Sequence, residues 1–156
     1  MPTAKLSMIA IIVVVCLGIG VAWAAPVAYW VLTYGCRADE DRLAAALATL
    51  GVLDAHPANA TPQEERNSSC DSDDRITSVW QNYRFSGPRA DVLSFYRDIA
   101  IMDGWVLSPD DDGEGGICFT KSFGETEADL SVDFSKAGGE YGVHVTSSVN
   151  GGGWGC

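Results

Sequence analysis

The sequence predicts an α+β protein with an N-terminal transmembrane helix and a small two-layer domain. In that domain, one helix is expected to pack on an antiparallel sheet of four to five strands. Residues 6–36 form one run without a charged side chain, and about twenty apolar residues in a helix suffice to span a bilayer core. Residues 75–149 combine one segment of helical periodicity with several segments of alternating apolar and polar residues, which is typical of a helix packed on a sheet.

The uncharged run is expected to be a retained membrane anchor. Residues 1–5 form a short tail, and residues 6–34 form the anchor or uncleaved signal. Cleavage after Ala24 is the alternative, because the three residues 22–24 fit a signal-peptidase site. The anchor is favoured because the aromatic residues of the run lie only at its C-terminal end, as at a membrane–water interface: Trp23, Tyr29, Trp30 and Tyr34.

The cysteines indicate an oxidising compartment. Cys16 lies inside the apolar run, and four others are expected to form two disulfides. Of three possible connectivities, the favoured one is Cys36–Cys70 with Cys118–Cys156. Their wide spacing does not support a zinc site, and the residues before Cys16 and Cys36 fit a lipoprotein signal poorly.

The expected location is the cell membrane, in a single-pass protein whose C-terminal domain lies outside the cytoplasm. Arg37 and Arg42 alone would favour the opposite orientation, but the domain cysteines outweigh them. The layout of an apolar anchor and a small acidic domain with cysteines resembles that of small envelope proteins of GC-rich bacteria. No residue role follows from that likeness.

Charge restricts the partners. Residues 37–156 hold all 21 acidic residues and nine of the ten basic ones, a formal charge of −12. Such a domain repels phosphate backbones, so nucleic acid is excluded as a partner. The expected partners are the lipid bilayer, through residues 6–34, and an envelope protein or small ligand that is neutral or cationic.

The segments after the anchor are distinguished by periodicity. Three leucines at i, i+4 and i+7 predict the first helix, and a polar stretch with two prolines and no periodicity predicts a loop. The expected order is helix 37–52, loop or linker 53–74, α+β domain 75–149 and Gly-rich tail 150–156.

Within the domain, residues 75–85 predict a strand, and a helix follows between the caps near Gly87 and Gly104. The expected buried stripe of this helix is Val92, Phe95, Tyr96, Ile99 and Met102. Strands beginning at Trp105 and at Ile117 come next.

The last hairpin has a self-consistent register. A turn at 136–139 pairs Phe134 with Tyr141, Val132 with Val143 and Leu130 with Val145. All these apolar side chains then lie on one face, as a half-buried antiparallel sheet requires.

Three candidate sites follow from the sequence. Asp110, Asp112 and Glu114 alternate as in the start of a calcium-binding loop, although position 121, where the loop needs a Glu, is Lys121. A solvated acidic turn is the favoured interpretation, and no cofactor is expected beyond a weak possibility of Ca²⁺. The second candidate is an aromatic rim for a ligand, although core packing at a helix end is the favoured interpretation of Tyr96 and Trp105. The rim would consist of Trp80, Tyr96, Trp105 and Trp154.

The third candidate is a patch around His144. The predicted register places Ser131 opposite His144, with Asp129 and Asp133 on the diagonals, which suggests a hydrolase. A flat sheet face lacks a cleft and an oxyanion hole, so an ordinary polar face is favoured. The nearby carboxylates are expected to favour the charged imidazole.

The predicted function is therefore a membrane-anchored extracytoplasmic binding or interaction protein without catalytic activity. The alternative is an envelope hydrolase or calcium-dependent enzyme that uses the acidic turn 110–114 or the His144 patch. A third possibility is an anchored assembly factor whose transmembrane helix, rather than its domain, recognises the partner.

Overall fold

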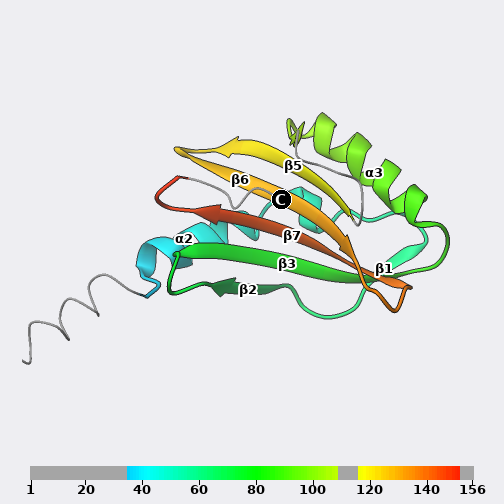
Figure 1. The fold of residues 1–156 in the computed structure, drawn as a ribbon, viewed down its shortest axis with the longest axis horizontal. Coiled ribbons are helices and arrows are strands. Elements are labelled where there is room, and N and C mark those ends of the chain that lie inside the picture. Colours follow the sequence, from blue (N-terminus) through cyan, green and yellow to red (C-terminus); the bar gives the residue numbers. More distant parts are fainter. Residues whose placement is uncertain (1–34, 109–115, 152–156) are drawn as a thin grey trace, which may run out of the picture. The chain divides into compact units, whose positions relative to one another are not determined.

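The computed structural model describes residues 35–108 and 116–151 (Figure 1). The chain divides into two units, Met1–Gly35 and Cys36–Cys156, and all described elements belong to the second. The predicted anchor over 6–34 lies outside the described residues and stays a prediction. Within the described residues, no helix has the length and hydropathy needed to cross a membrane.

The second unit has an α+β fold with one antiparallel seven-stranded sheet. Its elements, in chain order, are α2 (Ala38–Leu47), the 3₁₀ helix η1 (Gly51–Leu53), β1 (Ala60–Pro62), β2 (Asn67–Cys70), β3 (Ile76–Phe85), α3 (Arg89–Met102), β4 (Val106–Leu107), β5 (Gly116–Phe123), β6 (Thr126–Phe134) and β7 (Glu140–Ser148).

The strand order is β1-β3-β7-β6-β5-β4, and β2 also pairs with β3. Thus β1 and β2 follow one another along the same edge of β3. The sheet is larger than the predicted four to five strands, because the segment 53–74, expected as a loop, contributes β1 and β2. Both are short edge strands, and most of their residues are exposed, so they carry no apolar alternation that the sequence could show.

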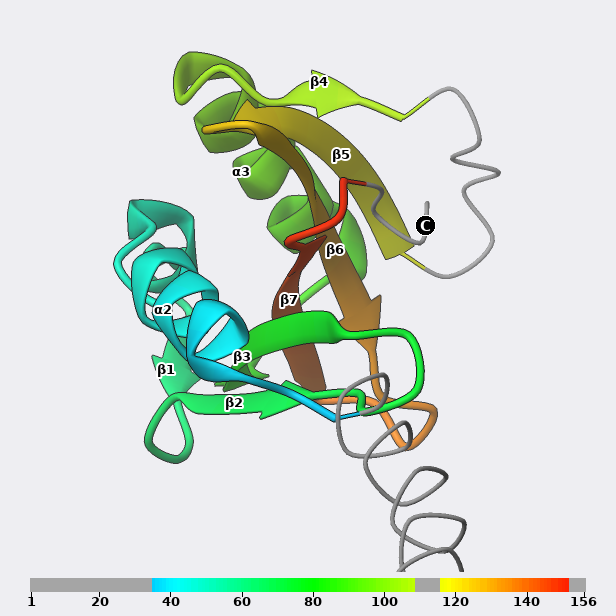
Figure 2. The ribbon, with the colours of Figure 1, turned by 90° about the vertical axis from the view of Figure 1, so that its left-hand side faces the viewer.

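Both helices pack on one face of the sheet, and two helices rather than one form the second layer (Figure 2). The predicted hairpin register is confirmed, since Phe134, Val132 and Leu130 pair with Tyr141, Val143 and Val145. All of these side chains except the half-buried Phe134 join Leu47 of α2 and Val92 of α3 in one buried core, against which Phe134 packs.

The predicted stripe of α3 is wrong at one position. Val92 and Tyr96 are fully buried, but Met102 is 79% exposed. Met102 is the last residue of α3, and the chain reverses at Gly104, whose φ is +82°. Trp105, directly after this turn, is only 2% exposed and fills the core instead.

Three buried tyrosines tie the layers together. The Tyr83 hydroxyl donates to the Leu53 carbonyl at 2.5 Å, and the Tyr96 hydroxyl donates to the Ala55 carbonyl at 2.6 Å. The Tyr96 and Tyr141 hydroxyls lie 3.4 Å apart. Burial raises the pKa of all three phenols, that of Tyr83 to about 12.

The start of the domain is fixed to the sheet edge in two ways. Cys36 and Cys70 form the predicted disulfide, whereas Cys156, the predicted partner of Cys118, lies outside the described residues. The Glu40 carboxylate is fully buried and forms an ion pair with Arg75. Burial alone would raise the pKa of Glu40, but hydrogen bonds from the backbone and the Arg75 guanidinium outweigh it and hold the pKa below its ordinary value.

Replacing Glu40 by glutamine is expected to destabilise the full-length protein by about 3 kcal/mol, because a guanidinium that is largely buried loses its partner. Since the pKa of Glu40 is lowered on folding, its contribution is complete above about pH 4.5 and is lost as the pH falls. Urea unfolding followed by tryptophan fluorescence measures both effects.

Asp39→Asn in the same helix is the matched control, since Asp39 pairs with Arg42 on the surface and such pairs contribute less than about 1 kcal/mol. If both substitutions lowered the free energy of unfolding equally, the larger contribution assigned to the buried pair of Glu40 and Arg75 would be contradicted.

Alkaline titration is expected to unfold the domain. A phenol whose pKa is raised on folding contributes stability that is complete below its unfolded pKa of about 10 and is lost as the pH rises. Three of the five tyrosines should therefore form phenolate only as near-ultraviolet circular dichroism is lost. Ionisation of all five tyrosines near pH 10 with the dichroism unchanged would refute the prediction.

Candidate functional site

The outer face of the sheet, opposite the helices, carries the polar residues. One row across it places Cys118, Ser131, His144 and Trp80 side by side on β5, β6, β7 and β3. Ser131 is directly opposite His144, and Asp133 pairs with Gly142 beside it, so the predicted neighbours of His144 are confirmed.

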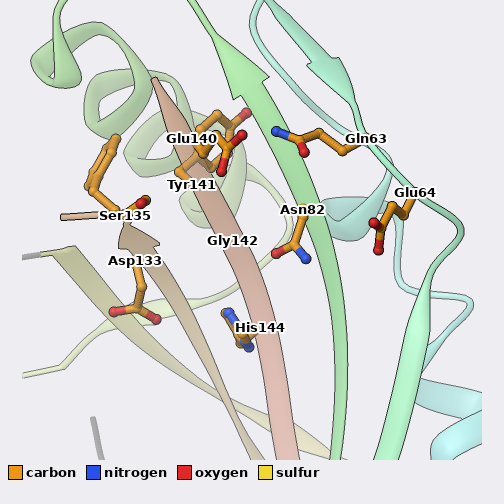
Figure 3. Close-up of a pocket in the computed structure, with 10 residues that line it drawn as sticks. Gln63, Glu64, Asn82, Asp133, Ser135, Glu140, Tyr141, Gly142 and His144 are labelled. Carbon is orange, nitrogen blue, oxygen red and sulfur yellow. The ribbon is translucent and has the colours of Figure 1, made fainter. Parts of the chain in front are cut away.

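A groove of about 320 Å³ lies next to this row, and we call it the outer groove (Figure 3). Its walls come from the segment after β1, from the end of β6 and from β3 and β7. The lining residues are Gln63, Glu64, Asn82, Asp133, Phe134, Ser135, Glu140, Tyr141, Gly142 and His144.

One wall exists because β1 and β2 pair with two separate segments of the same edge of β3. The Gln63 N–H donates to the Asn82 carbonyl at 3.0 Å, and the chain then leaves the sheet until β2 begins at Asn67. Gln81 stabilises the segment between β1 and β2, since its side-chain amide donates to the Glu64 carbonyl at 2.8 Å. Gln81 is only 6% exposed and interrupts the apolar alternation of β3, so it is the sequence signal that marks this wall.

The floor depends on Gly142. A Cβ added there would lie 2.5 Å from Nε2 of His144 and 3.1 Å from Oδ1 of Asn82. The missing side chain therefore lets the imidazole lie over the backbone of β7, close to the Asn82 amide. Any larger residue at 142 would displace His144.

His144 is less basic than an exposed histidine. Its ring stacks on Trp80 with a centroid distance of 6.2 Å and an interplanar angle of 17°. Desolvation lowers the pKa of His144, and the nearby Asp133 carboxylate raises it only in part. The carboxylate favours the charged imidazole, as expected, but burial in the folded sheet, which the sequence did not indicate, outweighs it.

The hydrogen bonds of this patch do not form a catalytic relay. The Ser131 hydroxyl donates to Asp133 Oδ2 at 2.7 Å and is therefore directed to the carboxylate rather than to the imidazole. A serine nucleophile would need its proton directed to the histidine. Among the described residues, the patch thus provides hydrogen-bonding groups rather than an activated nucleophile.

Several polar groups of the outer groove are available to a ligand. Within residues 35–108 and 116–151, the side chains of Glu64, Asn82 and His144 form no hydrogen bond with another residue. Glu140 pairs with Arg84 at 3.3 Å. Hydrogen bonding from Gln63, followed by Arg84, lowers the pKa of Glu140.

The described residues of the predicted aromatic rim do not meet. Tyr96 and Trp105 are buried in the core, with the Trp105 indole N–H donating to Asp103 at 3.0 Å, so neither forms a rim with Trp80. Trp154 and the predicted calcium ligands Asp110, Asp112 and Glu114 lie outside the described residues. The described parts of the chain contain no group of three histidine, cysteine or acidic residues placed to hold a metal ion.

The titration of His144 is expected to have its midpoint below the ordinary value of about 6.5. Asp133→Asn should lower it further, because it removes the carboxylate that favours the imidazolium. Proton NMR measures both, since the chain has only two histidines and His144→Gln assigns the signal. Glu127→Gln, on the same strand away from the groove, should leave the midpoint unchanged. A wild-type midpoint above 6.5 would disprove the desolvation argument.

Comparison with known proteins identifies no relative of the chain. No protein-family description, no curated protein and no solved structure matches the chain significantly. The interpretation of the outer groove therefore depends on its own residues and on physical chemistry.

Proposed function

We infer that the protein is a membrane-anchored binding protein without catalytic activity, whose domain lies outside the cytoplasm and takes a ligand in the outer groove. The observation that carries this proposal is the groove itself, in which the side chains of Glu64, Asn82 and His144 have no hydrogen-bonding partner within the described residues. Concave sites with a few convergent polar groups are typical of ligand binding.

Two further observations support the location. Residues 6–36 are uncharged over a length that can span a bilayer. The Cys36–Cys70 disulfide is typical of a compartment outside the reducing cytosol. An enzymatic alternative receives less support, because the Ser131 hydroxyl is directed to Asp133.

The location is tested with the full-length protein expressed in bacterial cells. It should stay in the membrane pellet after a carbonate wash, and external protease should digest the domain in intact spheroplasts. A domain that resists protease until the membrane is lysed would overturn the extracytoplasmic placement. A soluble product that begins at residue 25 would overturn the anchor.

Ligand binding is tested with the NMR signal of His144 as the reporter. Cationic, neutral and anionic small molecules are added separately at millimolar concentration to the full-length protein in detergent micelles. At least one class should shift the His144 signal saturably, and Asn82→Ala should weaken that binding by about threefold to tenfold, the worth of one hydrogen bond. If no class shifts the signal of the folded protein, the outer groove is not a small-ligand site.

A further inference from the structure

We propose that the outer groove recognises a cation that donates hydrogen bonds, namely an ammonium or guanidinium group of the size of a lysine or arginine side chain. This inference rests on the proposed function and names the class of ligand. Three of the ten lining residues are carboxylates, Glu64, Asp133 and Glu140, and none is lysine or arginine.

Two of the three carboxylates have no cationic partner within the described residues. Arg84 pairs with Glu140, and both side chains are substantially exposed, so this pair contributes little. Glu64 and Asp133 form no ion pair with any described residue. A ligand cation would supply the missing opposite charge, and charge-assisted hydrogen bonds to carboxylates are the stronger kind.

The arrangement of these carboxylates suits a single bound group. Figure 3 shows Asp133 on one side of the groove and Glu64 on the other, with Asn82 and Gly142 between them and His144 beside the same floor. The two carboxylates come from opposite walls, one after β1 and one at the end of β6. A cation in the groove is attracted by the carboxylates of both walls and can form a charge-assisted hydrogen bond with the one it approaches.

The neutral groups of the floor also suit a donor. Asn82 presents an amide oxygen near the Gly142 position, and a neutral imidazole has one nitrogen that accepts a hydrogen bond. An ammonium has three N–H donors and a guanidinium has five, and neither has an acceptor. The volume of about 320 Å³ is at the low end for ligand sites, which fits one side chain better than a large ligand.

His144 lines the groove with an aromatic ring that itself stacks on Trp80. Guanidinium groups stack on such rings and are less strongly hydrated than ammonium groups. An anionic ligand would face uncompensated carboxylates. A neutral sugar would leave both carboxylates unpaired as water is displaced, which costs free energy.

The test compares matched ligands that differ in charge. N-acetyl-arginine methylamide, N-acetyl-lysine methylamide and the neutral N-acetyl-citrulline methylamide are titrated into the full-length protein in micelles, with the His144 signal as the reporter. The arginine or lysine compound should bind at least about tenfold more tightly than the citrulline compound, as expected for charge-assisted contacts. Free spermidine and the peptide Gly-Arg-Gly distinguish a free amine from a side chain on a peptide.

Substitutions of single carboxylates show which side chains contact the bound cation. Asp133→Asn and Glu64→Gln should each weaken binding of the cationic compound by about tenfold. Glu127→Gln removes the same formal charge from β6, about 20 Å along the strand, and should leave binding nearly unchanged. Equal binding of the arginine and citrulline compounds, or equal loss in all three variants, would overturn the cation inference while leaving a ligand-binding groove. Binding by none of the compounds in any charge class would remove the proposed function as well.

Discussion

The contact among Tyr83, Tyr96 and Tyr141 is the interaction on which the rest of the domain depends. The rings of Tyr83 and Tyr141 stack across β3 and β7 at 5.2 Å, and Tyr96 of α3 meets Tyr141 edge-on at 5.9 Å. Such rings bury a large apolar area, but each hydroxyl must find a partner inside the core. The carbonyls of Leu53 and Ala55 accept two of these bonds. The sheet, α3 and the end of η1 with the segment that follows it are therefore joined at one place.

The same cluster supports the outer groove from behind. Side chains alternate between the two faces of a strand, so Tyr83 and Tyr141 face the core while their neighbours Asn82 and Gly142 face the groove. The tyrosines also fix the segment that leads into β1, and β1 ends where Gln63 and Glu64 form the wall. A binding surface supported in this way loses less conformational entropy when it binds a ligand.

The sequence predicted those features that depend on local periodicity. Alternation over 129–134 and 140–145 was enough to give the register of the last hairpin, and helical spacing was enough to place α3. β1 and β2 were missed, because a polar edge strand is defined by backbone pairing with β3 rather than by its own side chains. The groove was missed for the same reason, since one wall follows from the break between β1 and β2. The protonation of His144 depends on its burial beside Trp80 and Gly142, which no local pattern reveals.

Selectivity in such a site has to come from individual contacts rather than from net charge. The formal charge of −12 on residues 37–156 attracts cations in general, but salt screens charges beyond about 8 Å at physiological ionic strength. Every cation in solution experiences that general attraction, so it cannot distinguish a cation that donates hydrogen bonds from a metal ion. Glu64 and Asp133 can do so, because they approach from opposite walls and Asn82 and His144 add acceptors of fixed direction. The strands beneath these side chains are held in place by the tyrosines. The site would thus select cations that donate hydrogen bonds, which net charge alone cannot do.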